Sequence, residues 1–554
     1  MPPRSTRAAA TKPAVNGTST TEAAPRSRSR GAKRSSSPIA EKEAPPPSKR
    51  SRTAKKEVES KPEKPVARAN SRKKVAANTA TKAPAKKAAT VKVSAGKVSR
   101  RTESHPINGL PAVPEHTRPA PILFGWGAGN FGQLGMGSEL LGDYDKPKKN
   151  PWVTEKVEDG AFGSEDAGLE TIAAGGMHTL LVDERGTVWT CGVNDEGALG
   201  RVTVGVPNPD KEGEFLDVDE LTAVPHPVQS LVDEDFRAVR VAAGDSVSAA
   251  ISSTGELRVW GSFRGNQGAL GFSNEQQRQF QPAAILNLHN RAADQHPEKF
   301  VSVAAGNNHL VILTTHGHIY TLGAGEEGQL GRKVIERRKI HGTAPERIIL
   351  GTRTRKAVVV GAGNNHSFAV DQTGDVWAWG LNTKGQTGTG YRHSGIDGEV
   401  HVPKRVIGLS KEELGGDTVV EIVGGDHHTL FLTSNGKVYA CGRSNDGQLG
   451  LADDDPAFED REFEDFLPTP ALVTFPDAED PVAHISAGTH NNLAVTAGGA
   501  LYAWGAQTQG ELGVGEDVEA KTPKVVVRKE GGSWAAIVAA CGGQHTLALL
   551  RKKN

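Results

Sequence analysis

Five histidines recur at one position of a repeated phrase, Gly-x-x-His, and they are the side chains of this chain best suited to proton transfer or metal binding. They are His178, His309, His366, His428 and His545. A histidine that moves protons or binds zinc needs a second acid, nucleophile or ligand at a fixed distance. The adjacent pair His427-His428 has no Cys or acidic partner at ligand spacing. We therefore expect most of these histidines to be structural, with hydrogen bonds inside their own repeat, and we expect no metal and no covalent catalysis.

Two segments, 127–132 and 323–328, match the Gly-x-Gly-x-x-Gly pattern of dinucleotide-binding loops. Such a loop binds phosphate where a helix follows it, because the helix N-terminus supplies free N–H groups. Both segments continue instead into Gln-Leu-Gly, part of a repeated turn. We therefore expect no nucleotide cofactor. The three widely spaced cysteines, Cys191, Cys441 and Cys541, predict neither a disulfide framework nor a zinc site.

Repeats organise most of the chain. A phrase that ends in an apolar residue and glycine returns seven times at spacings of 57 to 69 residues, and Gly-Gln-Leu-Gly or a relative usually follows it. The glycines of the seven copies are Gly127, Gly192, Gly261, Gly323, Gly380, Gly442 and Gly505. Alternating apolar residues flank a turn glycine in each repeat, which is typical of paired β-strands. Seven such repeats predict an all-β fold, a closed seven-bladed β-propeller with four-stranded blades.

The ends of the repeat region indicate how the ring closes. The seventh repeat stops at Leu550 before its expected final strand, and an unassigned strand at 121–127 precedes the first repeat. We expect 121–127 to pair into the last blade, because this pairing removes an open sheet edge. The predicted propeller is therefore 121–554.

The first 120 residues differ sharply in composition from the rest. They hold 28 Lys and Arg against eight Glu and no Asp, whereas 121–554 holds 38 basic and 57 acidic residues. The segment contains no Phe, Trp or Tyr, so it has too little apolar surface to offset the entropy of ordering itself. We expect 1–120 to be a disordered basic tail that binds polyanions. The chain has no apolar run of membrane-spanning length, so we expect a soluble, intracellular protein.

The repeated phrases resemble those of the regulator of chromosome condensation family over roughly 121–550, the entire predicted propeller. Non-repetitive phrases make the resemblance closest to the members that exchange nucleotide on the small GTPase Ran. These phrases lie at 175–179, 194–201, 243–245, 260–264, 425–429 and 543–546.

The resemblance implies that one propeller face binds Ran and that a short wedge reaches its nucleotide-binding region. The wedge corresponds to Phe263, Arg264, Gly265, Asn266, Gln267, Gly268, Ala269 and Leu270. The other implied contact residues are Asp245, Arg332, His428 and His545. The family leads us to expect acidic residues where this chain has Asn130 and Asn308. An amide keeps the hydrogen-bond acceptor and loses the charge.

The resemblance also implies a function. The chain would be a guanine nucleotide exchange factor without covalent chemistry or cofactor, acting in nucleocytoplasmic transport and mitosis. The alternative is a propeller scaffold that holds chromatin or another protein without exchange activity. A hydrolase or transferase is disfavoured, because the repeats present no nucleophile or paired acid and base.

Basic clusters predict the location of the protein. Those of the tail are typical of nuclear-import and nucleic-acid segments, and a loop after 331 is similar in placement to the family's nucleosome-binding loop. The tail residues are Arg26, Arg28, Arg30, Lys33, Arg34, Lys49, Arg50, Arg52, Lys55, Lys56, Arg72, Lys73 and Lys74, and the loop residues are Arg337 and Arg338. The expected partners besides Ran are nucleosomes, histones and DNA, and nuclear import receptors through the tail. We expect a chromatin-associated protein of the nucleus that does not bind membranes.

Overall fold

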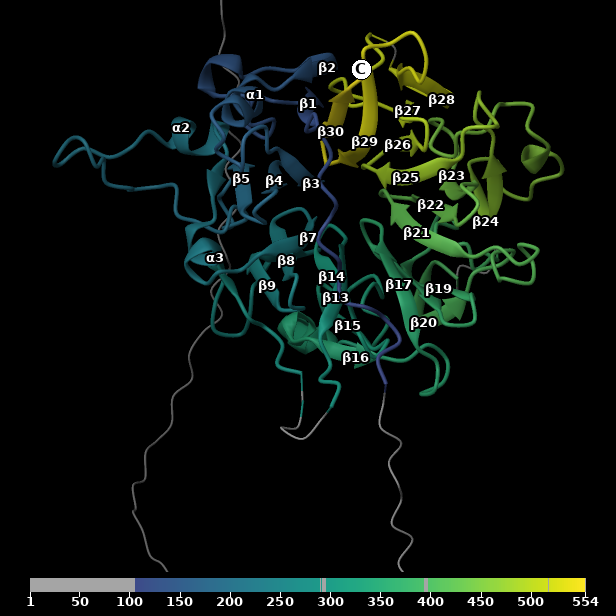
Figure 1. The fold of residues 1–554 in the computed structure, drawn as a ribbon. Coiled ribbons are helices and arrows are strands. Elements are labelled where there is room, and N and C mark those ends of the chain that lie inside the picture. The colour runs from purple at the N-terminus through teal and green to yellow at the C-terminus, as the bar shows by residue number, and fades with distance from the viewer. Residues whose placement is uncertain (1–104, 289, 291–294, 393–396, 517, 554) are drawn as a thin grey trace, which may run out of the picture. The chain divides into compact units, whose positions relative to one another are not determined.

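The computed structural model of the 554-residue chain describes residues 105–553 apart from 289, 291–294, 393–396 and 517. In this part, strands gather into sheets that are arranged as blades around a central axis (Figure 1). Five sheets have four strands, and an eight-stranded sheet consists of two four-stranded blades joined by one parallel bridge between Ala362 and Val423. The predicted all-β propeller is confirmed.

The blades are numbered here in chain order. Blade 1 contains β3 (Leu169–Ala174), β4 (His178–Asp183), β5 (Val188–Gly192) and β6 (His226–Pro227). Blade 2 contains β7 (Ala238–Ala243), β8 (Val247–Ser252), β9 (Leu257–Gly261) and β12 (Gln279–Ala283). Blade 3 contains β13 (Phe300–Ala305), β14 (His309–Thr314), β15 (Ile319–Gly323) and β16 (Glu346–Ile348). Blade 4 contains β17 (Ala357–Ala362), β18 (His366–Asp371), β19 (Val376–Leu381) and β20 (Glu399–Arg405).

The remaining blades complete the ring. Blade 5 contains β21 (Val419–Gly424), β22 (His428–Thr433), β23 (Val438–Arg443) and β24 (Phe466–Val473), and blade 6 contains β25 (Val482–Ala487), β26 (Asn491–Thr496), β27 (Leu501–Ala506) and β28 (Glu519–Val527). Blade 7 contains β29 (Trp534–Cys541), β30 (His545–Lys552), β1 (Ile122–Gly127) and β2 (Tyr144–Lys149). Short helices occupy connections: η1 (Ser138–Leu140), α1 (Pro151–Glu158), α2 (Val218–Ala223), α3 (Gln229–Asp233), η2 (Glu336–Thr343) and η3 (Pro456–Phe458). None of the described helices is long and apolar enough to cross a membrane.

Blade 7 joins the two ends of the propeller. Strand β1 pairs antiparallel with β30, from Ile122 opposite Leu550 to Gly127 opposite His545. Strand β2 then pairs with the other edge of β1. The last blade therefore takes two strands from the N-terminal side of the repeats.

Neighbouring blades are tied together by the tryptophans of the repeated Trp-Gly phrase. Trp126, Trp260, Trp379 and Trp504 are all fully buried. The indole N–H of Trp260 donates to the carbonyl oxygen of Ala198 at 2.8 Å, and Ala198 belongs to the Gly-Ala-Leu-Gly turn of the preceding blade. Trp379 makes the same contact with Gln329 at 2.9 Å. The two repeated phrases are thus coupled because each Trp satisfies a carbonyl group of the neighbouring blade's turn.

The repeated histidines make a second tie. The ring Nε2 of His178 lies 2.8 Å from the hydroxyl oxygen of Ser248 in the next blade, and that hydroxyl donates to the carbonyl oxygen of Ala198 at 2.9 Å. The same arrangement joins His309 to Ser367, His366 to Thr429, His428 to Asn492 and His545 to Thr179. The expectation of hydrogen bonds within each repeat is therefore wrong, because the partners belong to the adjacent blade.

The glycine of each Gly-x-x-His phrase has a steric cause. A Cβ atom on Gly306 would lie 2.2 Å from the ring carbon Cε1 of His309, and one on Gly175 would lie 2.3 Å from that of His178. Non-bonded carbon atoms are normally about 3.5–4.0 Å apart. Glycine at this position therefore lets the histidine ring reach across to the next blade.

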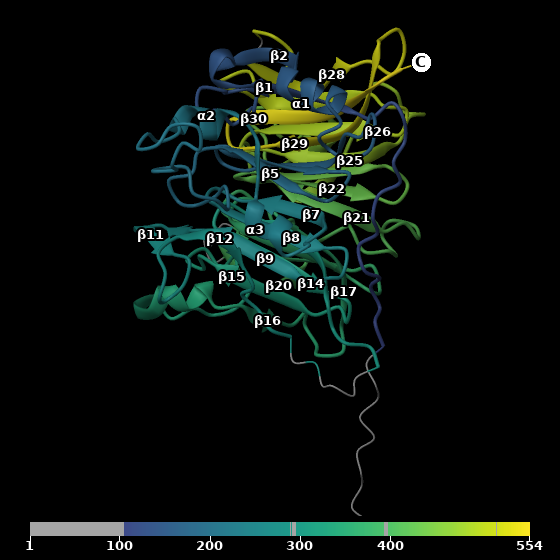
Figure 2. The same cartoon turned by 60° about the vertical axis from the view of Figure 1, so that its left-hand side comes forward.

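The propeller has two distinct faces. The Gly-x-x-His loops and the Gly-Gln-Leu-Gly turns form one of them, here called the loop face, and the hairpin turns at Gly186, Gly255 and Gly317 lie on the opposite turn face. Residues 105–120, here called the strap, cross the turn face. Figure 2 shows the strap as the purple segment on the right, opposite strand β11 (Gly268–Gly271) on the left. The side-chain amide of Asn108 donates to the carbonyl oxygens of Thr314 and Ala357, each at 3.0 Å.

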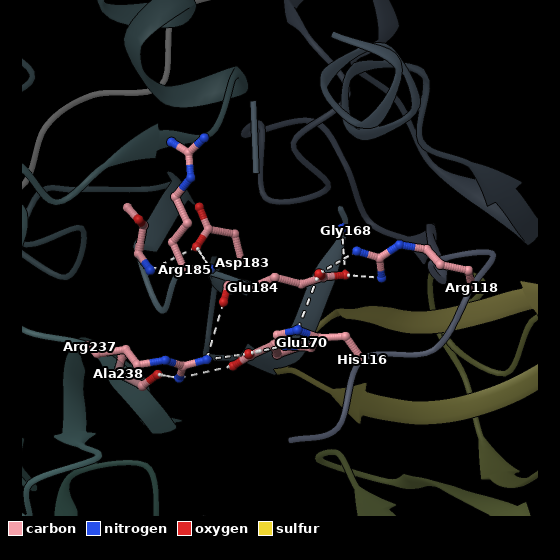
Figure 3. A network of polar contacts seen from close by, with 10 residues as sticks. His116, Arg118, Gly168, Glu170, Asp183, Glu184, Arg185, Arg237 and Ala238 are labelled. Carbon is pink, nitrogen blue, oxygen red and sulfur yellow. Dashed lines mark hydrogen bonds and ion pairs between the residues drawn. The ribbon is translucent and has the colours of Figure 1, made fainter. Parts of the chain in front are cut away.

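Two buried carboxylates on blade 1 fix the other end of the strap (Figure 3). Arg118 donates two hydrogen bonds to Glu184, at 2.9 and 2.8 Å. His116 lies 2.6 Å from Glu170, which also pairs with Arg237 of blade 2. The assignment of 105–120 to the disordered tail is therefore wrong, because specific polar contacts hold the strap to the propeller. The rest of the predicted tail, 1–104, lies outside the described residues.

Candidate functional site

The segment predicted to be a wedge forms a hairpin on the loop face. Strand β10 (Phe263–Gly265) pairs antiparallel with β11, with Arg264 opposite Ala269 and Gly265 opposite Gly268. This hairpin is a separate two-stranded sheet that leaves blade 2 between β9 and β12. The turn uses Gly268 at a φ of +106°, a conformation that favours glycine. Asn266 and Gln267, at the tip, are exposed.

An aromatic pair anchors the hairpin at its base. Phe263 is fully buried and stacks on Phe272 with ring centroids 6.3 Å apart and an angle of 12° between planes. Both rings belong to the core between blades 2 and 3. The two ends of the hairpin are therefore fixed, and its tip projects beyond this anchor.

Arg264 lies between two carboxylates from different blades. Its guanidinium nitrogens are 3.8 Å from Glu196 of blade 1 and 3.9 Å from Asp245 of blade 2. Burial raises the pKa of Asp245, and the Arg264 charge opposes that rise. The predicted contact residue Asp245 thus sits beside the hairpin, partly exposed on the loop face.

Blade 3 supports the other side of the hairpin. The side-chain oxygen of Asn308 accepts a hydrogen bond from the backbone N–H of Arg264 at 2.7 Å. The backbone N–H of Asn266 donates to Glu326, and its side-chain amide donates to Glu327 at 2.6 Å. The two glutamates belong to the Gly-x-Gly-x-x-Gly segment 323–328, which therefore positions the hairpin.

The loop predicted to bind nucleosomes lies next to the hairpin. It contains η2, which follows the Gly-Gln-Leu-Gly turn of blade 3 and contacts β11. Lys339 of this loop donates to Glu326 at 2.6 Å, so one carboxylate holds both the loop and the hairpin. Arg337 and Arg338 are exposed.

Two of the implied contact residues are not available on the surface. His428 and His545 are fully buried, and burial lowers the pKa of His428 to about 4 and that of His545 to about 3. The prediction that either ring contacts a partner directly is therefore wrong, since both rings are buried, uncharged and hydrogen-bonded to the next blade. The neighbouring His427 is partly exposed and lies 2.8 Å from Asp426. The sequence alone did not indicate which of the two adjacent histidines is exposed.

Arg332 forms hydrogen bonds to the backbone of the loop that follows it. Its guanidinium donates to the carbonyl oxygens of Gly342 at 3.0 Å and Ala344 at 2.8 Å, and 11% of its side chain is exposed. Arg201 occupies the same repeat position in blade 1 and donates to the carbonyl oxygen of Leu221. The guanidinium of Arg332 therefore holds the loop after the turn, and its contact with Ran stays a prediction.

Asn130 keeps a carboxylate close by. Its amide donates to Asp143 at 2.6 Å, on the connection between β1 and β2. A negative charge is thus present next to the position where the family led us to expect one. Asp143 was not singled out from the sequence, although it lies only 13 residues after Asn130. Glu196 belongs to the phrase 194–201, but its contact with Arg264 depends on the packing of blade 1 against blade 2.

The remaining predicted residues are placed as follows. The tail residues between Arg26 and Lys74 lie outside the described residues. In the described part, no three His, Cys, Asp or Glu side chains gather as a metal site would need. The three cysteines are all buried free thiols.

Comparison with known proteins agrees with this architecture. The RCC1-like domain family model matches residues 122–548. Protein pim1 of Schizosaccharomyces pombe is 34% identical over 447 residues, which is 80% of this chain and 76% of pim1. The guanine nucleotide exchange factor SRM1 of Saccharomyces cerevisiae is 29% identical over 474 residues, which is 82% of this chain and 92% of SRM1.

A solved structure gives the same result. Prp20p from Saccharomyces cerevisiae, whose crystal structure was described together with its binding to Gsp1p and histones, matches with a TM-score of 0.66 at 29% identity. The match covers 79% of this chain and 93% of the Prp20p chain. The resemblance drawn from the repeats is confirmed, and the chain belongs to the family of regulator of chromosome condensation proteins that share the RCC1-like domain.

Proposed function

We propose that this protein is a guanine nucleotide exchange factor for the small GTPase Ran, bound to chromatin and acting in the nucleus. The observation that carries the proposal is the hairpin Phe263–Leu270, which is anchored by buried Phe263 and supported by Asn308 and Glu326. An exposed, braced hairpin of this kind suits insertion into a partner. The family membership, and the exchange activity in the name of SRM1, support the choice of reaction.

The mechanism follows from linkage. A protein that binds the nucleotide-free GTPase better than the nucleotide-bound form weakens nucleotide binding by the same factor. Each tenfold acceleration of release requires about 1.4 kcal/mol of barrier lowering, so a factor of ~10⁵ requires about 7 kcal/mol. An interface with a few strong contacts supplies energies of this size. No covalent bond of the protein or the nucleotide changes.

The hairpin's role is to occupy space and place dipoles at the nucleotide-binding region. Its position depends on Arg264, whose charge is balanced by Glu196 and Asp245. A rigid hairpin loses little entropy on insertion, and therefore more of the contact energy appears as displacement of the nucleotide. The proposed contact face also includes Asp245, Asn130 with its neighbour Asp143, and the partly exposed His427.

Chromatin binding is assigned to other parts of the chain. The basic tail is suited to DNA phosphates and to nuclear import receptors, because it carries many cations and no aromatic side chains. Exposed Arg337 and Arg338 are suited to an acidic protein surface such as that of a histone complex. The binding of Prp20p to histones supports this assignment.

Release of a fluorescent guanine nucleotide from Ran tests the proposal. The full chain at catalytic concentration is expected to accelerate GDP release by several orders of magnitude without hydrolysis. Release at the spontaneous rate with stoichiometric protein would contradict the proposal and favour a scaffold that binds chromatin without exchange.

A further inference from the structure

A second feature of the loop face is a cleft of about 640 Å³ beside the hairpin. Three blades form it: the turn after β1 in blade 7, the long connection between β5 and β6 in blade 1, and the start of β12 in blade 2. Phe131, Val202, Val204, Val218 and Phe280 supply most of its apolar lining.

These apolar side chains are unusually exposed. Phe131 is 57% exposed, Val202 52% and Val204 71%. Single exposed apolar residues are common on proteins, but a contiguous group with a polar rim marks an interaction surface. The burial of a Phe or Val side chain typically contributes about 1.5–3 kcal/mol, so a partner that covers this cleft gains substantial affinity.

The rim of the cleft is acidic. Asp195 and Asp219 line it, and the positive charge of Arg278 is balanced by Glu196 at 3.1 Å. Glu196 is also a neighbour of Arg264 in the hairpin. The cleft is therefore continuous with the hairpin through Arg278, Glu196 and Arg264.

We propose that this cleft is a docking site for the GTPase, where it binds a surface element with a bulky apolar side chain flanked by Lys or Arg. This inference rests on the proposed function and deepens it. The cleft holds the GTPase in both nucleotide states and contributes uniform binding, whereas the hairpin acts on nucleotide release. Interactions equal in the ground and transition states lower KM and leave kcat unchanged.

The protein's own tail fits the cleft less well. Residues 1–104 contain no Leu, Phe, Trp or Tyr and a single Ile, Ile39, so the tail has few of the large side chains that would fill the apolar lining. The strap also begins on the turn face, where Asn108 bonds to Thr314 and Ala357, opposite the cleft.

The test compares two full-length variants in catalysed GDP release from Ran. The cleft variant combines Phe131→Ser with Val204→Ser, and the control is Val402→Ser on the outer strand β20 of blade 4, where Val402 is 65% exposed. Because all three side chains are largely exposed, melting temperatures are expected to match the wild type. The cleft variant is expected to raise KM about tenfold, the loss typical of one or two central interface side chains, with kcat unchanged. The control is expected to change neither.

The outcomes separate the two proposals. A KM within twofold of the wild type, or a lowered kcat with unchanged KM, would overturn the docking site while the exchange function stands. A wild-type chain without exchange activity would refute the proposed function and this inference together. If the tail occupies the cleft instead, the full-length cleft variant would bind the GTPase more tightly than the full-length wild type. That result would identify residues 1–104 as the occupant and overturn the docking site.

Discussion

The side-chain oxygen of Asn308 accepts a hydrogen bond from the backbone N–H of Arg264 at 2.7 Å and thereby joins blade 3 to the base of the hairpin. The family resemblance led us to expect an acidic residue at position 308. The amide oxygen of Asn308 makes a contact that a carboxylate oxygen would also make. Asn308 therefore acts as a positioning residue.

The substitution Asn308→Ala is expected to slow catalysed release about fivefold in kcat, because one net hydrogen bond is typically about 1 kcal/mol. The matched control is Asn365→Ala, at the same repeat position in blade 4, which is expected to leave kcat unchanged. Asn308→Asp keeps the acceptor and is expected to retain activity. Equal kcat for Asn308→Ala and the control would show that the hairpin does not depend on this contact.

The buried histidines allow a prediction about stability. His428→Ala, His545→Ala and His366→Ala are each expected to destabilise the propeller by about 1–3 kcal/mol, since each leaves a buried polar partner unsatisfied. Exchange measured on the folded fraction is expected to be similar in all three. Chemical denaturation combined with release kinetics checks this. A specific loss of exchange in His428→Ala or His545→Ala at unchanged stability would return these residues to the contact face.

The same histidines predict sensitivity to acid. Burial lowers the pKa of His178 and His428 to about 4 and that of His309, His366 and His545 to about 3. The unfolded chain binds their protons near pH ~6.5 and the folded chain does not, so their contribution to stability is complete above pH ~6.5 and is lost as the pH falls below it.

Between pH ~6.5 and its folded pKa, each histidine lowers the free energy of unfolding by about 1.4 kcal/mol for each unit by which the pH falls. For all five histidines the sum is about 7 kcal/mol per pH unit. His484 opposes the trend: burial lowers its pKa, but Glu421 outweighs burial and the net pKa is raised, so it gives stability that is present at low pH and lost as the pH rises through its folded value. Melting temperatures between about pH 7.5 and 5 check the sum. His366→Asn, which copies Asn491 at the equivalent position of blade 6, is expected to reduce the slope by about one proton. A melting temperature that does not change between these pH values would contradict the burial of these histidines in their neutral form.

The tail and the loop arginines are expected to bind chromatin through separable contacts. Deletion of 1–104, which leaves the strap intact, is expected to remove most free-DNA affinity and to leave exchange unchanged. For the full chain, six to ten phosphate contacts would lose about 10³ to 10⁵ in affinity between 50 and 200 mM salt. Changing Arg337 and Arg338 to Ala is expected to weaken nucleosome binding and not DNA binding. Unchanged DNA affinity and salt slope after the deletion would place the DNA-binding surface on the propeller.

The sequence predicted the features that repeat and missed those that depend on neighbours. The period of the Trp-Gly and Gly-x-x-His phrases was enough to predict the blades, because each phrase marks the same contact in blade after blade. The repeated position of His428 correctly predicted a structural role, whereas its assignment as a contact residue came from the family resemblance and does not fit a fully buried ring.

Contacts between distant segments carried no pattern at all. Glu196 meets Arg264 only because blades 1 and 2 are adjacent, and Asp245 approaches it from the β7–β8 loop of blade 2. The strap was assigned to the tail from its composition, because Arg118 and His116 find Glu184 and Glu170 through individual ion pairs rather than through apolar periodicity.

The role of the hairpin is tested most sharply by the release of fluorescent GDP from Ran with a full-length variant whose hairpin tip, residues 265–268, is replaced with two glycines. Phe263 and Phe272 remain in place, so the fold is expected to be retained, and binding of the GTPase is expected to persist through the rest of the loop face. If the hairpin drives exchange, kcat for release is expected to fall at least about a hundredfold while KM changes less than about threefold, since the loss of a contact made only on the way to release lowers kcat alone. Release at the wild-type rate by this variant would show that the hairpin does not drive exchange.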